Sequence, residues 1–211
     1  EGVVELLRRR GAEINKQNSD GISALMCAAA HGHPAVVLRL LRAGADTAVR
    51  SEDGKTALQW AKEEGHAACV GAFRQHIEEV TAARREAAAG GAGGASSGGA
   101  AAGARAAASS GSPGSLSEEA RQAAARGEEA ALLAWLDSGG RVNATCGVDN
   151  VSGLTALMLA AQKGQEGVVE LLRRRGAEIN KQNSDGISAL MCAAAHGHPA
   201  VVLRLLRAGA D

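Results

Sequence analysis

The hydrophobic positions of the chain follow a short helical pattern that recurs along its length. Residues 24–30 form an Ala-rich apolar run, and residues 34–42 place their apolar side chains on one stripe at the spacing of an α-helix. Ser23 precedes the first run, where its hydroxyl can cap a helix N-terminus. Pro34 opens the second segment, where its missing N–H costs nothing, and Gly44 ends it in the left-handed geometry that glycine tolerates. This pattern predicts two short helices joined by a turn.

The pattern is repeated on two scales. Equivalent segments lie 33 residues apart within each half of the chain, opening at Gly21 and Gly54 and again at Gly153 and Gly186. On the larger scale, residues 1–46 are identical to residues 166–211. A period of this length, with two helices and a turn in each unit, predicts a stacked repeat array.

The repeated residues resemble the ankyrin-repeat family. The segments DGISAL (20–25), AAAHGH (28–33) and VVLRLLRAGAD (36–46) stand in the order and spacing of that family's motif. The family's TPLH signature is altered, for example to TALM at 155–158, so the usual Thr–His hydrogen bond is absent and high stability is not expected. The resemblance covers about three quarters of the chain. It implies an all-α ankyrin repeat solenoid with hairpin turns.

The repeats predict two truncated blocks joined by a Gly/Ala/Ser-rich linker. The expected boundaries are a block at 1–83, with a full repeat at 18–50 and a C-terminal cap at 51–83; a linker at 84–114; and a block at 115–211, with an N-terminal cap at 115–149, a repeat at 150–182 and an incomplete repeat at 183–211. A flexible linker would span about 30 Å without fixing the angle between the blocks. The first block is expected to lack its front and the second its C-terminal cap. Apolar surface should therefore be exposed near Glu1 and Asp211 unless something covers it.

Composition narrows the function classes. The 23 basic and 23 acidic residues give a net charge of zero, which argues against nucleic acid or an anionic membrane as the partner. No apolar run is long enough to span a bilayer. The four cysteines form no CxxC pair, and Cys27 has apolar neighbours, so small buried thiols are expected rather than disulfides. This usage favours a reducing compartment, the cytoplasm or the nucleus.

The resemblance also implies where a partner would bind. In ankyrin-like proteins the turn tips and the inner helices form a concave groove that binds partner proteins. Aliphatic side chains at turn tips, such as Ile22, Val151 and Leu154, favour such a groove over ordinary solvated turns. The candidate partner-binding residues are Lys16, Gln17, Asn18, Asp20, Ile22, His31, Glu52, Lys55, Asn150, Val151, Leu154, Gln162, Lys163, Lys181, Gln182, Asn183, Asp185, Ile187 and His196.

Other candidate chemistry is weaker. His31 and His33 straddle a turn and supply too few ligands for zinc, so hydrogen bonding at the turn is expected. The Arg runs at 8–10 and 173–175 fall in the last turn of a helix, where cations complement the helix dipole. Asn15 and Asn180 lie in a sequence that looks like the hydroxylation site of ankyrin hairpins, but an Asn that completes a turn is the simpler interpretation and is favoured.

No catalytic motif, phosphate-binding loop, metal site or cofactor site is expected from this sequence. The sequence therefore predicts a non-enzymatic protein–protein interaction module or scaffold, in which two tandem blocks could raise avidity for a repeated partner. Two alternatives stay open. The chain could be the substrate-recruiting arm of an enzyme whose catalytic domain lies elsewhere, or it could assemble with other copies through exposed repeat ends.

Overall fold

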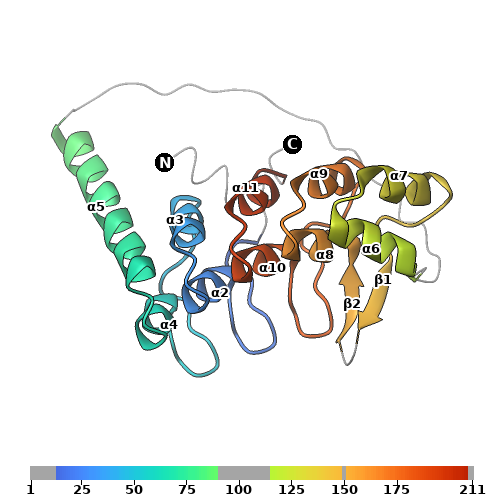
Figure 1. Cartoon of the computed structure of the whole chain (residues 1–211). Helices are drawn as coiled ribbons and strands as arrows, with labels where there is room; N and C mark the ends of the chain where they lie inside the picture. The colour runs from blue at the N-terminus through green and yellow to red at the C-terminus, as the bar shows by residue number, and fades with distance from the viewer. Residues whose placement is uncertain (1–12, 90–114, 149–150, 209–211) are drawn as a thin grey trace.

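The computed structural model describes residues 13–89, 115–148 and 151–208, which form a stack of short helical pairs (Figure 1). The helices are α2 (Ala24–Ala30), α3 (Pro34–Arg42), α4 (Ala57–Glu63), α5 (Ala67–Ala89), α6 (Glu118–Arg126), α7 (Glu129–Asp137), α8 (Ala156–Gln162), α9 (Glu166–Arg174), α10 (Ala189–Ala195) and α11 (Pro199–Ala208). The strands are β1 (Thr145–Val148) and β2 (Val151–Thr155). We call residues 13–89 the N-terminal half and the described residues from 115 to 208 the C-terminal half.

The predicted capping residues begin the inner helices. In each case a hydroxyl accepts a hydrogen bond from a backbone N–H of the first helical turn, as Ser23 does from Met26 and Ser188 from Met191. Thr56 and Thr155 cap their helices in the same way. Pro34 is the first residue of α3, as its position predicted. Local sequence thus sets where each of these helices begins.

Hairpin turns connect the helical pairs. The most regular one pairs β1 with β2 in antiparallel register, with Thr145 opposite Thr155 and Cys146 opposite Leu154. Two of the equivalent turns retain an isolated bridge, Gln17 to Ser23 and Gln182 to Ser188. Short helical pairs with hairpin turns confirm the predicted all-α repeat solenoid.

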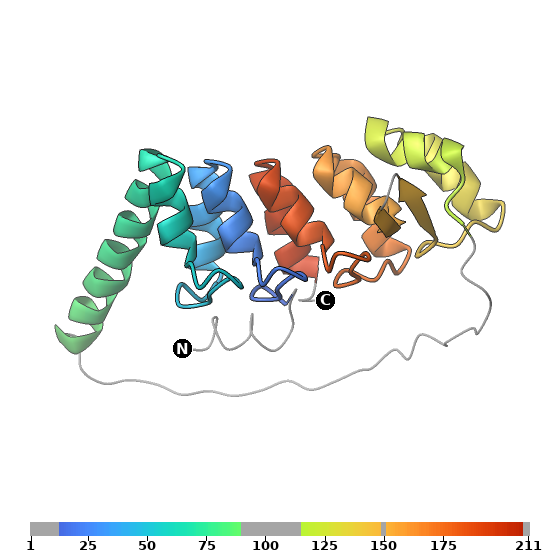
Figure 2. The ribbon, with the colours of Figure 1, turned by 90° about the horizontal axis from the view of Figure 1, so that it is seen from below.

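The two halves form one continuous stack instead of two separately oriented blocks (Figures 1 and 2). The helical pairs lie in the order α6/α7, α8/α9, α10/α11, α2/α3 and α4/α5, so the end of the C-terminal half packs on the beginning of the N-terminal half. The expectation of blocks without a fixed relative angle was wrong, because α10 packs on α2 and α11 on α3. We call this contact the junction. It covers the apolar face that was expected to be open at the end of the C-terminal half; Glu1 and Asp211 themselves lie outside the described residues.

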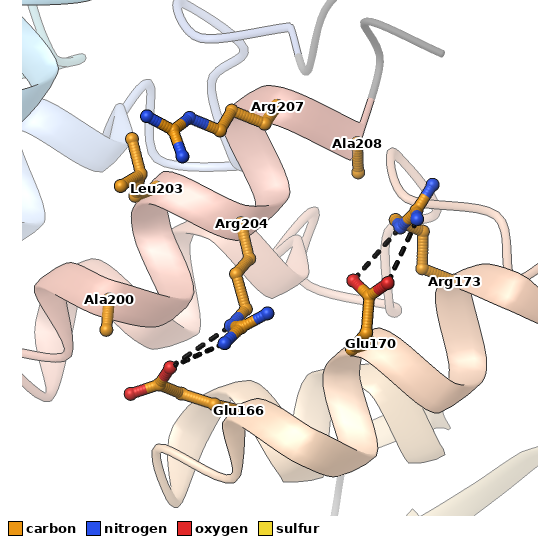
Figure 3. A pocket seen from close by; sticks show the side chains of 8 residues that line it. All are labelled: Glu166, Glu170, Arg173, Ala200, Leu203, Arg204, Arg207 and Ala208. Carbon is orange, nitrogen blue, oxygen red and sulfur yellow. Dashed lines mark hydrogen bonds and ion pairs between the residues drawn. The ribbon is translucent and has the colours of Figure 1, made fainter.

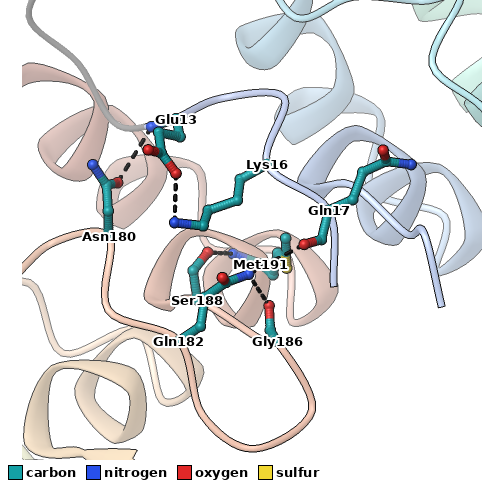
Figure 4. A network of polar contacts seen from close by, with 8 residues as sticks. All are labelled: Glu13, Lys16, Gln17, Asn180, Gln182, Gly186, Ser188 and Met191. Carbon is teal, nitrogen blue, oxygen red and sulfur yellow. Dashed lines mark hydrogen bonds and ion pairs between the residues drawn. The ribbon is translucent and has the colours of Figure 1, made fainter. Parts of the chain in front are cut away.

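Hydrogen bonds at the junction repeat those between covalently consecutive repeats (Figure 4). The Glu13 N–H donates to Asn180 Oδ1 (3.2 Å), as the Asp46 N–H does to Asn15 Oδ1 (2.9 Å). Asn180 and Asn15 occupy the same position in the two copies of the repeated sequence. Each asparagine therefore links one hairpin turn to the next, and the junction has the same link as an interface inside one half.

Three further bonds recur in the same way. Gln182 Nε2 donates to the Gln17 carbonyl (3.2 Å), as Gln17 Nε2 does to the Arg50 carbonyl (2.8 Å). The Ser19 N–H donates to the Asp185 carbonyl (3.1 Å), as the Glu52 N–H does to the Asp20 carbonyl (3.0 Å). His33 Nε2 lies 3.0 Å from the Ala195 carbonyl, as the histidines of neighbouring repeats lie from theirs. The junction is thus an ordinary repeat interface formed without a direct peptide connection.

The core is thin, because the chain has few aromatic residues to fill it, only 1%. Alanines of the inner helices, such as Ala29 and Ala194, are fully buried and let neighbouring helices approach closely. Leu and Val of the outer helices fill the second layer, with Leu40 and Leu205 both completely buried. This packing aligns the inner helices on one face of the stack.

The two ends of the stack differ. At one end, α6 exposes Glu118, Glu119, Gln122 and Arg126, in agreement with the polar face expected of an N-terminal cap. At the other end, α5 continues to Ala89, six residues into the segment 84–114 that was expected to be linker. The projecting part of α5 leaves Ile77 and Val80 exposed.

Candidate functional site

The concave side of the solenoid holds an apolar groove that crosses the junction. Its floor comes from the inner helices α8, α10 and α2 and from the aliphatic side chains of the hairpin turns, and the polar side chains of those turns form its rim. The groove encloses about 490 Å³. The lining residues are Asn18, Ile22, Cys27, His31, Val148, Val151, Leu154, Met158, Leu159, Gln162, Asn183, Asp185, Ile187, Met191, Cys192, Ala195 and His196. Residues from both halves therefore form one surface.

Many of the predicted partner-binding residues meet in this groove. They are Asn18, Ile22, His31, Val151, Leu154, Gln162, Asn183, Asp185, Ile187 and His196. Ile22 and Ile187, from the two copies of the repeat, stand beside Leu154 of β2 as neighbouring tip aliphatics. Asn150 lies outside the described residues. All the predicted aliphatic residues therefore line the groove, whereas most of the predicted charged residues do not.

The remaining candidates do not line the groove. They are Lys16, Gln17, Asp20, Glu52, Lys55, Lys163, Lys181 and Gln182. Lys16 forms an ion pair with Glu13 (2.5 Å), and Lys55 pairs with Glu63 (2.5 Å) while lying over the ring of Trp60. Gln17 and Gln182 use their amides for the bonds between repeats described above. The structure gives these four side chains, of Lys16, Lys55, Gln17 and Gln182, contacts within the protein. Whether any of the eight candidates touches a partner stays a prediction.

Two histidines place polar atoms on the groove. Nδ1 of His31 lies 2.9 Å from the Cys27 carbonyl, and Nδ1 of His196 lies 3.0 Å from the Cys192 carbonyl. A carbonyl can only accept, so in the neutral ring Nδ1 carries the proton and Nε2 is an acceptor. Gln162 Nε2 lies 3.4 Å from His196 Nε2, in agreement with this tautomer. The groove therefore combines an aliphatic floor with imidazole acceptors at one edge.

Comparison with known families agrees with this geometry. A family model described as ankyrin repeats (3 copies) matches residues 1–83 and 121–211. The chain belongs to the ankyrin-repeat family. No curated protein matches the chain. Ankyrin repeats are generally protein–protein interaction modules and are typically not catalytic. The groove described above, which we call the ankyrin groove, is therefore the candidate functional site.

The described residues also bear on membrane-spanning segments and metal sites. None of the helices in the described ranges has the length and apolar character needed to cross a membrane. Among the same residues, no three His, Cys, Asp or Glu side chains are grouped so that they could hold a metal ion.

Sequence reasoning missed the sulfur-containing part of the ankyrin groove. Cys27 and Cys192 were expected to be buried, but both are only partly buried and line the floor. Met158 and Met191 are almost fully buried, yet both also reach the groove. The apolar flanks of these residues indicate burial equally well in a core and in a groove floor. The signal that could have found them is their position on the inner helix, one turn from His31 and His196.

The thiols of the groove are held in their protonated form. Burial raises the pKa of Cys27 to about 11, and burial together with the neighbouring Cys27 raises the pKa of Cys192 to about 12. Burial disfavours the thiolate because a charge loses its hydration in an apolar environment. At neutral pH these cysteines are therefore neutral, weakly nucleophilic parts of an apolar floor.

These raised pKa values predict an alkaline loss of stability. The folded protein keeps both protons to a higher pH than the unfolded chain, so the stabilisation is complete below about pH 8.5 and is lost as pH rises toward 11–12. Because both side chains are partly exposed, we expect a loss on the order of 1 kcal/mol per thiol by about pH 10.5. Urea unfolding at a series of pH values should show a steeper alkaline decline than in the variant Cys27→Ser/Cys192→Ser. If the free energy of unfolding fell equally with pH in both proteins, the raised pKa values of Cys27 and Cys192 would be contradicted.

The asparagines predicted as hydroxylation candidates have structural roles. The side-chain oxygens of Asn15 and Asn180 accept the hydrogen bonds that join successive hairpin turns. This agrees with the simpler interpretation of a turn asparagine, extended from one turn to its neighbour. The modification itself stays a prediction.

The convex side of the stack carries paired charges. Arg173 and Arg174 both bond to Glu170 and lower the pKa of that carboxyl group to about 2. Arg175 pairs with Asp137 at 2.7 Å, so each arginine of the run at 173–175 has a carboxylate partner. Figure 3 shows the cavity of about 280 Å³ between α9 and α11, where Arg204 also reaches across to Glu166. This surface is a network of ion pairs. The equivalent arginine run at 8–10 lies outside the described residues.

Proposed function

We propose that the protein is a non-enzymatic interaction module that binds a partner protein through the ankyrin groove. This proposal rests on the apolar floor of the groove. Ile22, Leu154 and Ile187 come from the hairpin turns and line this floor while only partly buried, although a monomer gains little by leaving aliphatic side chains partly exposed. An apolar floor with a polar rim is the usual anatomy of a protein interface.

The groove favours a partner segment with aliphatic or aromatic side chains flanked by hydrogen-bond donors. The floor can bury apolar side chains, and the Nε2 atom of His31 can accept an N–H group at the edge. Because both halves line one groove, a partner contacts both halves at once. The avidity expected of two separate blocks is therefore not part of this proposal.

A lysine placed on the floor tests the proposal. Partners captured with the full chain would be identified, and their affinity measured for wild type and for Ile187→Lys. We expect at least a 10-fold weaker affinity, since a buried unpaired cation costs at least about 1.4 kcal/mol. Ile77→Lys is the matched control, because Ile77 is 60% exposed on α5 and does not line the groove. Equal affinity of the three proteins, all folded by circular dichroism, would rule out the ankyrin groove as the binding site.

A further inference from the structure

We infer that the junction also forms between two chains, so that the protein exchanges halves in a closed dimer. The interaction surface is the face of α2/α3 that receives α10/α11, and its second occupant is α10/α11 of another copy. This goes beyond the proposed function, because each ankyrin groove of such a dimer would be lined by two chains. The inference follows from the chemistry of the junction, the caps at the two ends of the stack and the reach of the intervening segment.

The junction is held by non-covalent contacts alone. Its hydrogen bonds join Glu13 to Asn180, Gln17 to Gln182 and Ser19 to Asp185, and the chain connects these halves only through the segment 90–114. The Ser19 hydroxyl adds a second bond to the Asp185 carbonyl, at 2.9 Å. None of these contacts depends on both halves belonging to the same chain. A second copy therefore offers the same partners at the same positions.

The two repeats that meet at the junction have the same sequence, and their packing is the same whether they come from one chain or from two. Residues 178–208 have the same sequence as residues 13–43, so the junction places one repeat on an identical repeat. Such a head-to-tail contact usually permits open-ended growth. Here each half supplies one capped end, with polar α6 at one end and extended α5 at the other. A closed dimer therefore forms when two chains exchange their C-terminal halves, so that each N-terminal half packs on the C-terminal half of the other chain.

The closed monomer and the exchanged dimer contain the same contacts per chain. The length of the segment 90–114 therefore determines which of the two forms is favoured. The end of α5 and the start of α6 lie at opposite ends of the stack (Figures 1 and 2). Helical layers about 8–10 Å apart give a span of roughly 32–40 Å over the described pairs. The chain from Ala89 to Ser115 can extend to roughly 86–94 Å, so closure within one chain is permitted. At the millimolar effective concentrations typical of tethered sites, we expect mainly monomer in micromolar solutions.

Shortening the segment should drive exchange. Deleting residues 92–111 leaves a reach of roughly 20–22 Å between Ala89 and Ser115, which is less than the length of the stack. We expect light scattering after size exclusion to give the full chain a mass of 21.2 kDa and the deletion variant twice its own monomer mass. A folded deletion variant that stays monomeric over the micromolar range would overturn the inference.

A junction-specific control separates exchange from other dimers. A Cβ at residue 197 would lie 2.5 Å from the His33 ring across the junction, whereas a Cβ at residue 65 has no atom within 4 Å, and both glycines have positive φ. Adding Gly197→Ala to the deletion variant should therefore weaken the dimer, raising its dissociation constant at least about 5-fold above that of the deletion variant with Gly65→Ala. Equal dissociation constants for the two variants would mean that the dimer uses another surface and would refute the proposal.

If the deletion variant does not fold, the full chain provides the test. Refolding it on the order of 1 mM should trap a dimer fraction that grows with concentration, since that concentration approaches the effective concentration of the tether. The trapped dimer fraction should again be smaller with Gly197→Ala than with Gly65→Ala. A dimer fraction independent of concentration would exclude exchange. Mass readouts keep this test separate from the proposed function, because they need no partner protein.

Discussion

Leu205→Ala is expected to lower the free energy of unfolding by about 2–5 kcal/mol, and Leu40→Ala by the same amount. The two leucines occupy equivalent positions in the repeated sequence, and both are 0% exposed. Each lies in an outer helix with another outer helix on both sides, since α11 packs between α9 and α3, and α3 packs between α11 and α5. Urea unfolding followed by circular dichroism measures both losses.

The comparison tests the junction as well as the core. Leu38→Ala and Leu203→Ala form the matched control pair, because these equivalent leucines are only partly buried and should cost less than the buried pair. If the C-terminal half ended in an open repeat, Leu205 would lie at a loosely packed end and its truncation would cost clearly less than that of Leu40. Unequal losses would therefore contradict the continuous stack.

Gly197→Ala is expected to destabilise the protein more than Gly65→Ala, by about 1 kcal/mol or more. Both residues follow an inner helix with positive φ, +70° at Gly197 and +74° at Gly65, so both substitutions carry the same backbone cost of roughly 1–2 kcal/mol. At Gly197 the new methyl group also meets the His33 ring. That ring is held by its bond to the Ala195 carbonyl at 3.0 Å, so it cannot move aside without losing the bond.

Gly32→Ala supplies a second reference for this prediction. Its Cβ would lie 2.7 Å from the His66 ring, across an interface inside the N-terminal half. Gly32→Ala and Gly197→Ala should therefore destabilise similarly in chemical unfolding. A loss at Gly197 that matched Gly65 instead would show that His33 is not seated across the junction in solution.

The local part of the fold could be predicted because its causes are local. Ser23, Thr155 and Ser188 precede apolar helical runs, and a hydroxyl in that position has one obvious use. The 33-residue period likewise identified the helical pairs before their packing was known. For the same reason the tip aliphatics Ile22 and Ile187 could be assigned to the groove.

The junction and the groove floor could not be predicted from the pattern alone. A repeat period states that neighbours stack, but it does not say that residues 13–46 are the neighbours of residues 178–208. That pairing follows from surfaces left uncovered in three dimensions. Similarly, the apolar surroundings of Cys27 and Cys192 distinguish buried from solvated positions, but not a core from the floor of an open groove.

The long sequence separation across the junction has a consequence for folding kinetics. Bonds between consecutive repeats inside a half join residues 31 to 40 positions apart, whereas those at the junction join residues 162 to 167 apart. Loop closure costs about 0.6 kcal/mol more for each doubling of length, and non-local contacts slow the search for the native state. We therefore expect refolding in two kinetic phases, with rapid local assembly of each half followed by slower docking. Arrays of this family built from sequential repeats would lack the second phase.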